Sequence, residues 1–161
     1  MTRIFQRHMR WFLNLYPPFL GAGIRVKRLH PDRKAIDVEM NLRFWNANYV
    51  GTHFGGSLYS MTDPFYMLML IENLGSDYIV WDKSATIRFR KPGRGKVRAE
   101  FRLADFQIDE IREKLRTQDK IEPTFLVEVR DDAGDLVAVV EKVLHVRKKQ
   151  PASSQNTSTR I

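Results

Sequence analysis

Residues Asn46–Leu74 read NANYVGTHFGGSLYSMTDPFYMLMLIENL, and this stretch decides how the rest of the chain must fold. It begins as a polar loop with glycines and, after Gly55 and Gly56, becomes an apolar segment that continues to Leu74. Such a segment is too long for one strand and predicts a helix. A helix that is apolar on most sides has to be buried, so we expect a sheet wrapped around it.

Asp63 is the residue that does not fit an apolar helix. A carboxylate in that position is costly unless it is paired or takes part in chemistry. Pro64 removes a helical hydrogen bond and frees the carbonyl of Ser60, so we expect a kink beside this carboxylate. In the alternative interpretation, Asp63 caps a second helix that starts at Pro64, because Asp at the cap and Pro just inside it are a common pair.

Alternation of apolar and polar residues predicts strands on both sides of this helix. The expected strands are 24–28, 36–42, 78–81, 84–90, 97–103, 125–129 and 136–146. Helical spacing predicts further helices over 1–15 and 107–118. This order predicts an α+β fold in which one curved, mainly antiparallel sheet wraps one long apolar central helix.

We expect a single domain from the length of the chain. Residues 1–20 form an N-terminal helix and linker that pack on the domain, 21–147 form the domain itself, and the polar segment 148–161 is a disordered tail. The alternative for the basic N-terminal helix is a position on a membrane surface, but packing is commoner, and we expect no membrane partner. Its apolar run is too short for a span or a secretory signal, so we expect a cytoplasmic protein.

Composition limits the chemistry. The chain has no cysteine, which excludes disulfides, thiolate nucleophiles and cysteine-based metal sites. His8, His30 and His145 have no metal-ligand spacing, so we expect no metal. The formal net charge of +8 favours an anionic partner. No nucleic-acid-binding signature accompanies that charge, so a phosphorylated small molecule fits better than nucleic acid.

The residues around the glycine pair resemble a motif of the hotdog fold, specifically that of the PaaI-type acyl-CoA thioesterases of phenylacetate metabolism. That motif reads Asn-x-x-Gly-x-x-His-Gly-Gly, with an Asp or Glu seven residues later. Its matching positions in this sequence are Asn48, Gly51, Gly55, Gly56 and Asp63. The segment 85–93 also looks like the family's strand that ends in a proline beside the ligand. The resemblance covers roughly 20–147, and the chain also resembles an uncharacterised hotdog branch with an N-terminal extension.

One position departs from the motif. The family's histidine directly precedes the two glycines, whereas this chain has Phe54 there and His53 one place earlier. A shift by one residue on an extended strand points a side chain to the opposite face.

The resemblance implies a thioesterase without a Ser–His–Asp set. Asp63 would attack the thioester or activate a water, and a backbone N–H of Gly55 or Gly56 would polarise the carbonyl. Asn48 would orient the water or the carboxylate, and His53 would be a further candidate donor. In the family these groups meet across a dimer interface, so we expect a homodimer, which often pairs into a tetramer.

Coenzyme A would enter as part of the substrate, with no separate cofactor. Candidate phosphate contacts cluster on one strand and its turn: Arg88, Arg90, Lys91, Arg94 and Lys96. The same cluster is equally well explained as a solvated face. The acyl chain would lie against Tyr59, Phe65, Tyr66 and Met69, for which plain core packing is the simpler explanation.

Two functions remain open. The first is hydrolysis of an acyl-CoA or acyl-carrier thioester, favoured by Asp63, Asn48 and the glycines. The second is a non-catalytic acyl or acyl-CoA binding protein on the same scaffold, favoured by the shifted histidine. A hotdog dehydratase is disfavoured, because its acidic partner would fall at Met67. Asp82 is a possible second carboxylate of the site, but capping of a turn explains it more simply.

Overall fold

The computed structural model describes residues 3–149, with side chains from His8 onward. One antiparallel sheet has the strand order β1-β2-β4-β6-β7-β3, and β5 pairs with β7 off this path. The strands are β1 (Ile24–Leu29), β2 (Ala35–Asn41), β3 (Tyr78–Phe89), β4 (Lys96–Arg102), β5 (Lys120–Ile121), β6 (Thr124–Asp131) and β7 (Leu136–Lys148). The helices are α1 (Arg3–Leu15), α2 (Pro17–Ala22), α3 (Gly55–Ser60), α4 (Phe65–Leu74) and α5 (Asp105–Thr117).

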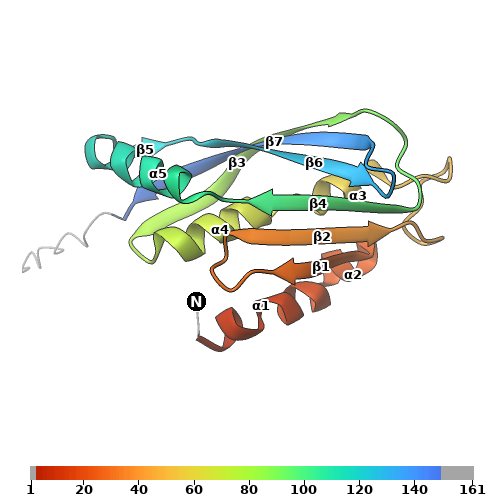
Figure 1. The fold of residues 1–161 in the computed structure, drawn as a ribbon, viewed down its shortest axis with the longest axis horizontal. Helices are drawn as coiled ribbons and strands as arrows, with labels where there is room; N and C mark the ends of the chain where they lie inside the picture. The colour runs from red at the N-terminus through yellow and green to blue at the C-terminus, as the bar shows by residue number, and fades with distance from the viewer. Residues whose placement is uncertain (1–2, 150–161) are drawn as a thin grey trace, which may run out of the picture.

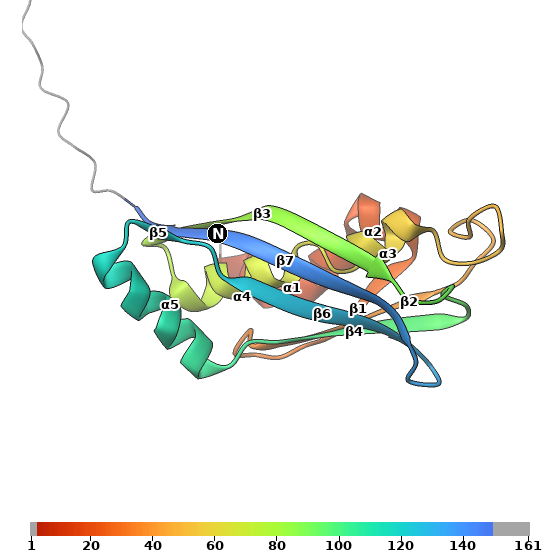
Figure 2. The ribbon, with the colours of Figure 1, turned by 90° about the horizontal axis from the view of Figure 1, so that it is seen from above.

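The sheet curves around α3 and α4, with β3 and β7 passing on one side and β1, β2 and β4 on the other (Figures 1 and 2). Alternation explains the strands: in β2, Ile36, Val38 and Met40 are buried and the residues between them are half-buried. The inner face of the sheet and the apolar sides of α3 and α4 share one core. The predicted α+β architecture is therefore confirmed.

The central helical segment is two helices rather than one. Residues 61–64 separate α3 from α4, because Pro64 has no N–H to continue the hydrogen-bond ladder. The Asp63 N–H bonds instead to the Ser60 carbonyl at 3.3 Å, closing the end of α3. The alternative of a separate second helix is thus correct in that respect, but Asp63 does not cap it, since its side chain points to other partners described below.

Strand β3 is continuous where the sequence predicted two strands with a polar turn between them. A bulge between Asp82 and Ser84 changes the register against β7 and shifts the alternation by one residue. Val80 is therefore buried and Asp82 is half-buried before the bulge, and Ala85 and Ile87 are half-buried after it. The prediction that Asp82 caps a turn is wrong, because the residue lies within a strand.

The two edges of the sheet differ. At the β1 edge, α1 lies alongside, and the side-chain amide of Asn14 pairs with both backbone groups of Val26, at 2.7 and 3.2 Å. Met9 and Leu13 of α1 are buried against the domain. Within residues 3–149, no strand pairs with the outer edge of β3, which is 12 residues long. An unpaired edge of this length is a template for pairing with another strand.

Two shorter elements were not expected. Helix α2 follows α1 directly and buries Phe19, and β5 is a two-residue strand beside the end of β7. The predicted disordered tail begins inside β7 at Lys148, and beyond Lys149 it lies outside the described residues.

Candidate functional site

Asp63, in the break between α3 and α4, belongs to a charged cluster made of Tyr59, Asp63, Asp82 and Lys142. One carboxylate oxygen of Asp63, Oδ1, accepts hydrogen bonds from the Tyr59 hydroxyl at 3.0 Å and from Lys142 Nζ at 2.9 Å. Lys142 Nζ also lies 3.0 Å from Oδ1 of Asp82. The Lys142 side chain is completely buried, whereas that of Asp63 is 47% exposed. The cluster therefore joins a buried cation to a carboxylate that solvent or a ligand can reach.

Burial and charge oppose each other in this cluster. Burial alone would lower the pKa of Lys142, but the two carboxylates outweigh it and raise the pKa above its ordinary value, so the side chain is an ammonium at neutral pH. Burial raises the pKa of Asp82, and the ammonium offsets this only in part. Burial likewise raises the pKa of the Tyr59 hydroxyl, which stays protonated and donates to Asp63.

Lys142 is the functional candidate that sequence reasoning missed. It lies in β7 and has the same strand parity as Val140 and Leu144, both fully buried. Period-two alternation therefore places this lysine on the inner face of the sheet. A lone lysine on a buried face needs a counter-charge, and that signal was available from the sequence.

At the other end of α3, Asn48 organises the loop that leads into the helix. Its side-chain oxygen accepts from the N–H groups of Val50 and Thr52 at 3.1 and 3.0 Å, and its amide donates to Thr52 Oγ1 at 2.9 Å. The side chain is therefore engaged within its own loop. Asn48 and Asp63 are not brought together in a single chain.

His53 faces away from the charged cluster. Its ring is buried, and Nε2 lies 2.9 Å from the carbonyl oxygen of Gly95, while its backbone N–H donates to the Gly93 carbonyl at 3.0 Å. Burial lowers the pKa of this histidine, so the ring is neutral, with the proton on Nε2. Nδ1 is buried with no partner among the described residues. The observed role of His53 is to tie the loop to the turn after β3.

Phe54, which replaces the family's histidine, stands at the N-terminal cap of α3 and is 57% exposed. Its ring covers Gly56, where a Cβ would lie 2.4 Å from Phe54 Cε1. A Cβ on Gly55 would lie 3.0 Å from the Phe89 ring. Both glycines therefore lie beneath rings that pack over the start of the helix, where the first N–H groups have no helical partner.

A pocket of about 410 Å³ opens beside this helix start. Its walls come from the loop before α3, from the start of α3, and from the end of β3 with its turn: Asn48, Thr52, His53, Gly55, Leu58, Phe89, Arg90, Lys91, Pro92 and Gly93. Asp63 does not line it. The pocket therefore gathers the predicted loop and turn residues, and the predicted carboxylate lies beyond the other end of α3.

The predicted phosphate contacts differ in availability. Lys91 pairs with Asp131 and Asp135, both at 2.6 Å, and so holds the turn against the β6–β7 hairpin. Arg88, Arg90 and Arg94 are exposed and form no ion pair with any residue from 8 to 149. These three arginines, of which Arg90 lines the pocket, are the groups available to an anion.

The residues predicted to contact the acyl chain also fall into two groups, those packed in the core and one beside the charged cluster. Phe65 is fully buried, with ring centroids 5.8 Å from Phe19 and 4.8 Å from Phe101, and its observed role is core packing. Tyr66 and Met69 are buried in the same core. Only Tyr59 borders the reachable carboxylate of Asp63.

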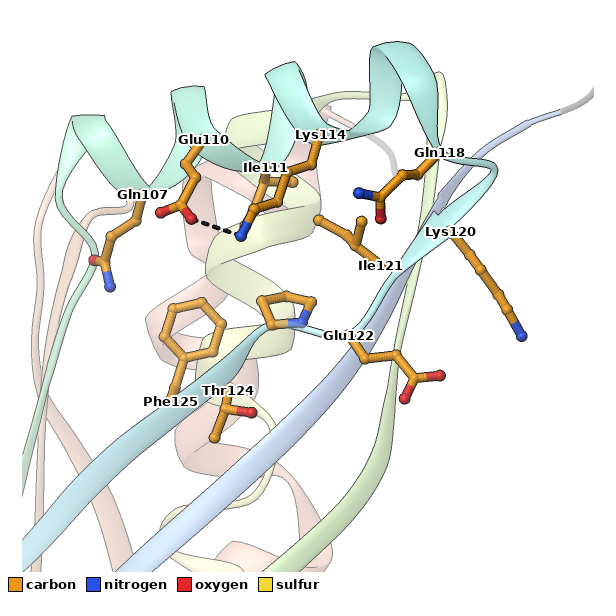
Figure 3. A pocket seen from close by; sticks show the side chains of 11 residues that line it. Gln107, Glu110, Ile111, Lys114, Gln118, Lys120, Ile121, Glu122, Thr124 and Phe125 are labelled. Atoms are coloured by element: carbon orange, nitrogen blue, oxygen red, sulfur yellow. Dashed lines mark ion pairs between the residues drawn. The ribbon is translucent and has the colours of Figure 1, made fainter.

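A different hollow lies between α5 and the β5–β6 segment (Figure 3). Glu110 and Lys114 at its rim pair with each other at 2.6 Å and are exposed, as are Lys120 and Glu122 (Figure 3). Gln107 is engaged by the backbone N–H of Ala104. Because these polar groups are solvated or already paired, we place the candidate site at the two ends of α3 instead.

Nowhere in residues 8–149 do three His, Asp or Glu side chains gather closely enough to hold a metal ion. Among the described helices, none is long and apolar enough to cross a membrane.

The fold matches known structures over nearly the whole chain. A protein of unknown function from Pseudomonas aeruginosa, called a probable thioesterase, is 22% identical, with a TM-score of 0.76, and covers 92% of this chain and 97% of its own. A thioesterase from Haemophilus influenzae is 14% identical, with a TM-score of 0.65, over 91% and 93% of the two chains. A protein of unknown function from Chlorobaculum tepidum is 13% identical, with a TM-score of 0.71, over 89% and 94%. The predicted hotdog fold is confirmed.

Similarity in sequence identifies a family for this chain but no function. The model of a family described as a domain of unknown function, DUF4442, matches residues 2–146. No curated protein is significantly similar to the chain.

Proposed function

Because the chain belongs to the DUF4442 family and has the hotdog fold, we propose that it is a thioesterase acting on acyl-CoA or acyl-carrier thioesters, with Asp63 as the reacting carboxylate. The observation that carries this proposal is the geometry of Asp63. Its carboxylate is 47% exposed, and two donors hold one of its oxygens from the protein side. A carboxylate fixed on one side and open on the other is suited to act as a base or nucleophile.

Hydrolysis would proceed as follows when Asp63 acts as a general base. The carboxylate takes a proton from a water molecule while the water oxygen bonds to the thioester carbon. The carbon–sulfur bond then breaks, and the sulfur leaves as a thiolate that takes up a proton. When Asp63 acts as the nucleophile, a carboxylate oxygen bonds to the thioester carbon and the carbon–sulfur bond breaks to release the thiolate, which takes up a proton. Water then hydrolyses the resulting mixed anhydride to the free acid and regenerates the Asp63 carboxylate.

The carbonyl would be polarised by a backbone N–H of Gly55 or Gly56 at the start of α3. Within one chain, α3 lies between these groups and Asp63. We infer that the partner's helix start faces Asp63 in a homodimer. The unpaired β3 edge supports this arrangement, because α1 lies along the opposite edge of the sheet, where Asn14 pairs with Val26.

The same dimer would place the exposed arginines Arg88, Arg90 and Arg94 beside the interface. Their free guanidinium groups are suited to bidentate contact with the phosphates of coenzyme A. Lys91 is engaged elsewhere and would contribute to the local potential only.

The test is thioester hydrolysis over a panel of acyl-CoAs from acetyl to long-chain and aromatic. Wild type is compared with Asp63→Asn and with Asp109→Asn, a control at an exposed carboxylate on α5. Asp63→Asn should lose at least about 100-fold in kcat with the dimer intact, and the control should match wild type. Turnover that is unaffected in Asp63→Asn would contradict the assignment of this carboxylate.

A second candidate is a non-catalytic protein that binds acyl-CoA. The observation that favours it is the position of His53, which is turned toward Gly95 and leaves Phe54 at the helix start. For that function, the same panel would show no turnover with any thioester, while calorimetry would still detect binding of an acyl-CoA.

A further inference from the structure

Lys142 is a buried ammonium whose charge is shared between two carboxylates from different parts of the chain. Nζ lies 2.9 Å from Asp63, in the α3–α4 break, and 3.0 Å from Asp82, in the bulge of β3. The third side of the ammonium faces the Tyr59 ring, whose centroid is 5.5 Å away. A lysine with no exposed surface and two anionic neighbours is held at one point in space.

The contacts of Asp63 are distributed unequally between its two oxygens. Both Tyr59 and Lys142 donate to Oδ1. No hydrogen bond from residues 8–149 reaches Oδ2. The exposed part of the side chain therefore includes an oxygen that is free to meet water or a ligand.

We propose that Lys142 is the positioning residue of the site: with Tyr59, it fixes Oδ1 of Asp63 so that Oδ2 is the oxygen that reacts. This inference rests on the proposed thioesterase function. Lys142 itself, fully buried behind the carboxylates, does not touch the substrate. Its action is to hold the carboxylate in one rotamer.

Asp82 has a separate part in this arrangement. Lys142 has four rotatable bonds, and a single partner would let its ammonium follow Asp63 as that side chain turned. The second ion pair, to Asp82, prevents this because β3 and β7 pair directly around it, with Ala85 opposite Lys142. On its other side β7 pairs with β6, where Phe125 is opposite Lys142. The ammonium thus stands on a strand that is paired on both sides, which is a rigid support for a site.

The decisive variant is Lys142→Met, which keeps the length of the side chain and removes its charge. We expect kcat to fall roughly 100-fold while KM changes by less than about threefold, because orientation acts on the reaction more than on binding. Lys114→Met, at an exposed lysine on α5, is the matched control and should match wild type. A kcat within about threefold of wild type in Lys142→Met would overturn the proposal.

A pH profile separates orientation from charge. The titratable groups that face Lys142 are Asp63, Asp82 and Tyr59, from the α3–α4 break, β3 and α3 respectively. Without the ammonium, the two carboxylates repel each other and the pair keeps one proton to a higher pH, so the acid limb of kcat/KM should move up by about one pH unit. Lys142→Met/Asp82→Asn should move the limb back without restoring kcat. Full recovery of kcat in this double variant would show that Lys142 only balances charge, and would overturn positioning.

Two measurements keep the test valid if activity or folding fails. Side-chain NMR couplings of Asp63 should report one χ1 rotamer in wild type and averaged rotamers in Lys142→Met, whether or not any thioester is hydrolysed. A protein inactive on every thioester, with this rotamer difference present, would refute the function and support the positioning; equal rotamers would refute the positioning. If Lys142→Met does not fold, Lys142→Arg keeps the charge but displaces the contact, and it should lower kcat with the acid limb unmoved. Unchanged kcat in Lys142→Arg would count against the proposal.

Discussion

Helix α3 has a glycine end, formed by Asn48, His53, Phe54, Gly55 and Gly56, and a charged end, formed by Tyr59, Asp63, Asp82 and Lys142. At the glycine end, Asn48 is bonded inside its own loop, and His53 adds one long-range contact to the turn at Gly95, 42 residues away in sequence. The charged end is held by ion pairs of Lys142 with Asp63, 79 positions away in sequence, and with Asp82 on another strand. The first end therefore depends mainly on local backbone conformation and on one turn, and the second depends on the finished sheet.

This difference separates stability from activity. Contacts that fix a loop conformation should show their loss mainly in the free energy of unfolding. Ion pairs that hold a partly exposed carboxylate contribute less to stability, because burying their charges costs nearly as much as pairing them returns. We therefore expect substitutions of the loop side chains at the glycine end, Asn48 and His53, to lower stability, and substitutions at the charged end to lower turnover.

Among the substitutions at the glycine end, the largest stability effect is expected for Asn48→Ala. The change removes hydrogen bonds to Val50 N–H, Thr52 N–H and Thr52 Oγ1, and we expect the free energy of unfolding to fall by about 2 kcal/mol in urea titrations. Asn48→Asp is the control, because its side chain still accepts from both N–H groups and should lose less than half as much. Equal losses in the two variants would mean that this loop is held by something other than the side-chain oxygen.

A smaller effect should appear when pH is lowered. Burial lowers the pKa of His53 below its ordinary value of 6.5, so the unfolded chain binds a proton before the folded chain does. The stability that His53 contributes is thus complete above about pH 6.5 and is lost as the pH falls below it. Unfolding by urea at about pH 7 and pH 5 should show this loss, and it should be smaller in His53→Gln.

Two other groups define the controls for this pH experiment. Burial also lowers the pKa of His145, which therefore adds its own contribution to the dependence of unfolding free energy on pH. A second variant, His145→Gln, removes that contribution. The contribution of Asp82 to the pH dependence of stability has the opposite sign, because burial raises its pKa. The folded chain therefore binds this proton first, and stability rises as the pH falls through the pKa of folded Asp82. If the dependence of unfolding free energy on pH were unchanged in His53→Gln, protonation of His53 would make no contribution to it.

Much of the fold was predictable because most strands are half-buried and alternate cleanly. Ile36, Val38 and Met40 mark β2 by spacing alone. The break after α3 was visible at Pro64, but the uninterrupted apolar sequence around it favoured one helix. In β3, the polar pair Asp82 and Lys83 looked like a turn, since a bulge that reverses the alternation has no sequence signature of its own.

Individual residues of the site could be predicted from the sequence, but the contacts between them could not. Asp63 stood out as a carboxylate in an apolar segment, and Lys142 could have been found from its parity in β7. Their pairing required knowing that the α3–α4 break packs over the middle of β7, which only the folded sheet decides. The role of His53 was hidden for the same reason, because Gly95, its partner, lies 42 residues away.

The smallest stability effect is expected for Gly56→Ala, and it is the sharpest comparison of the two ends. The new Cβ would lie 2.4 Å from Phe54 Cε1, so the ring must turn away; it is 57% exposed, and we expect the cost in unfolding free energy to stay below about 1 kcal/mol. Turnover should fall by about tenfold, because the displaced ring disturbs the N–H groups that would polarise the carbonyl. Gly21→Ala, where a Cβ meets nothing within 4 Å, is the matched control for both measurements. Normal turnover in Gly56→Ala would mean that the helix start takes no part in the reaction, and the catalytic groups would then have to be sought around Asp63 alone.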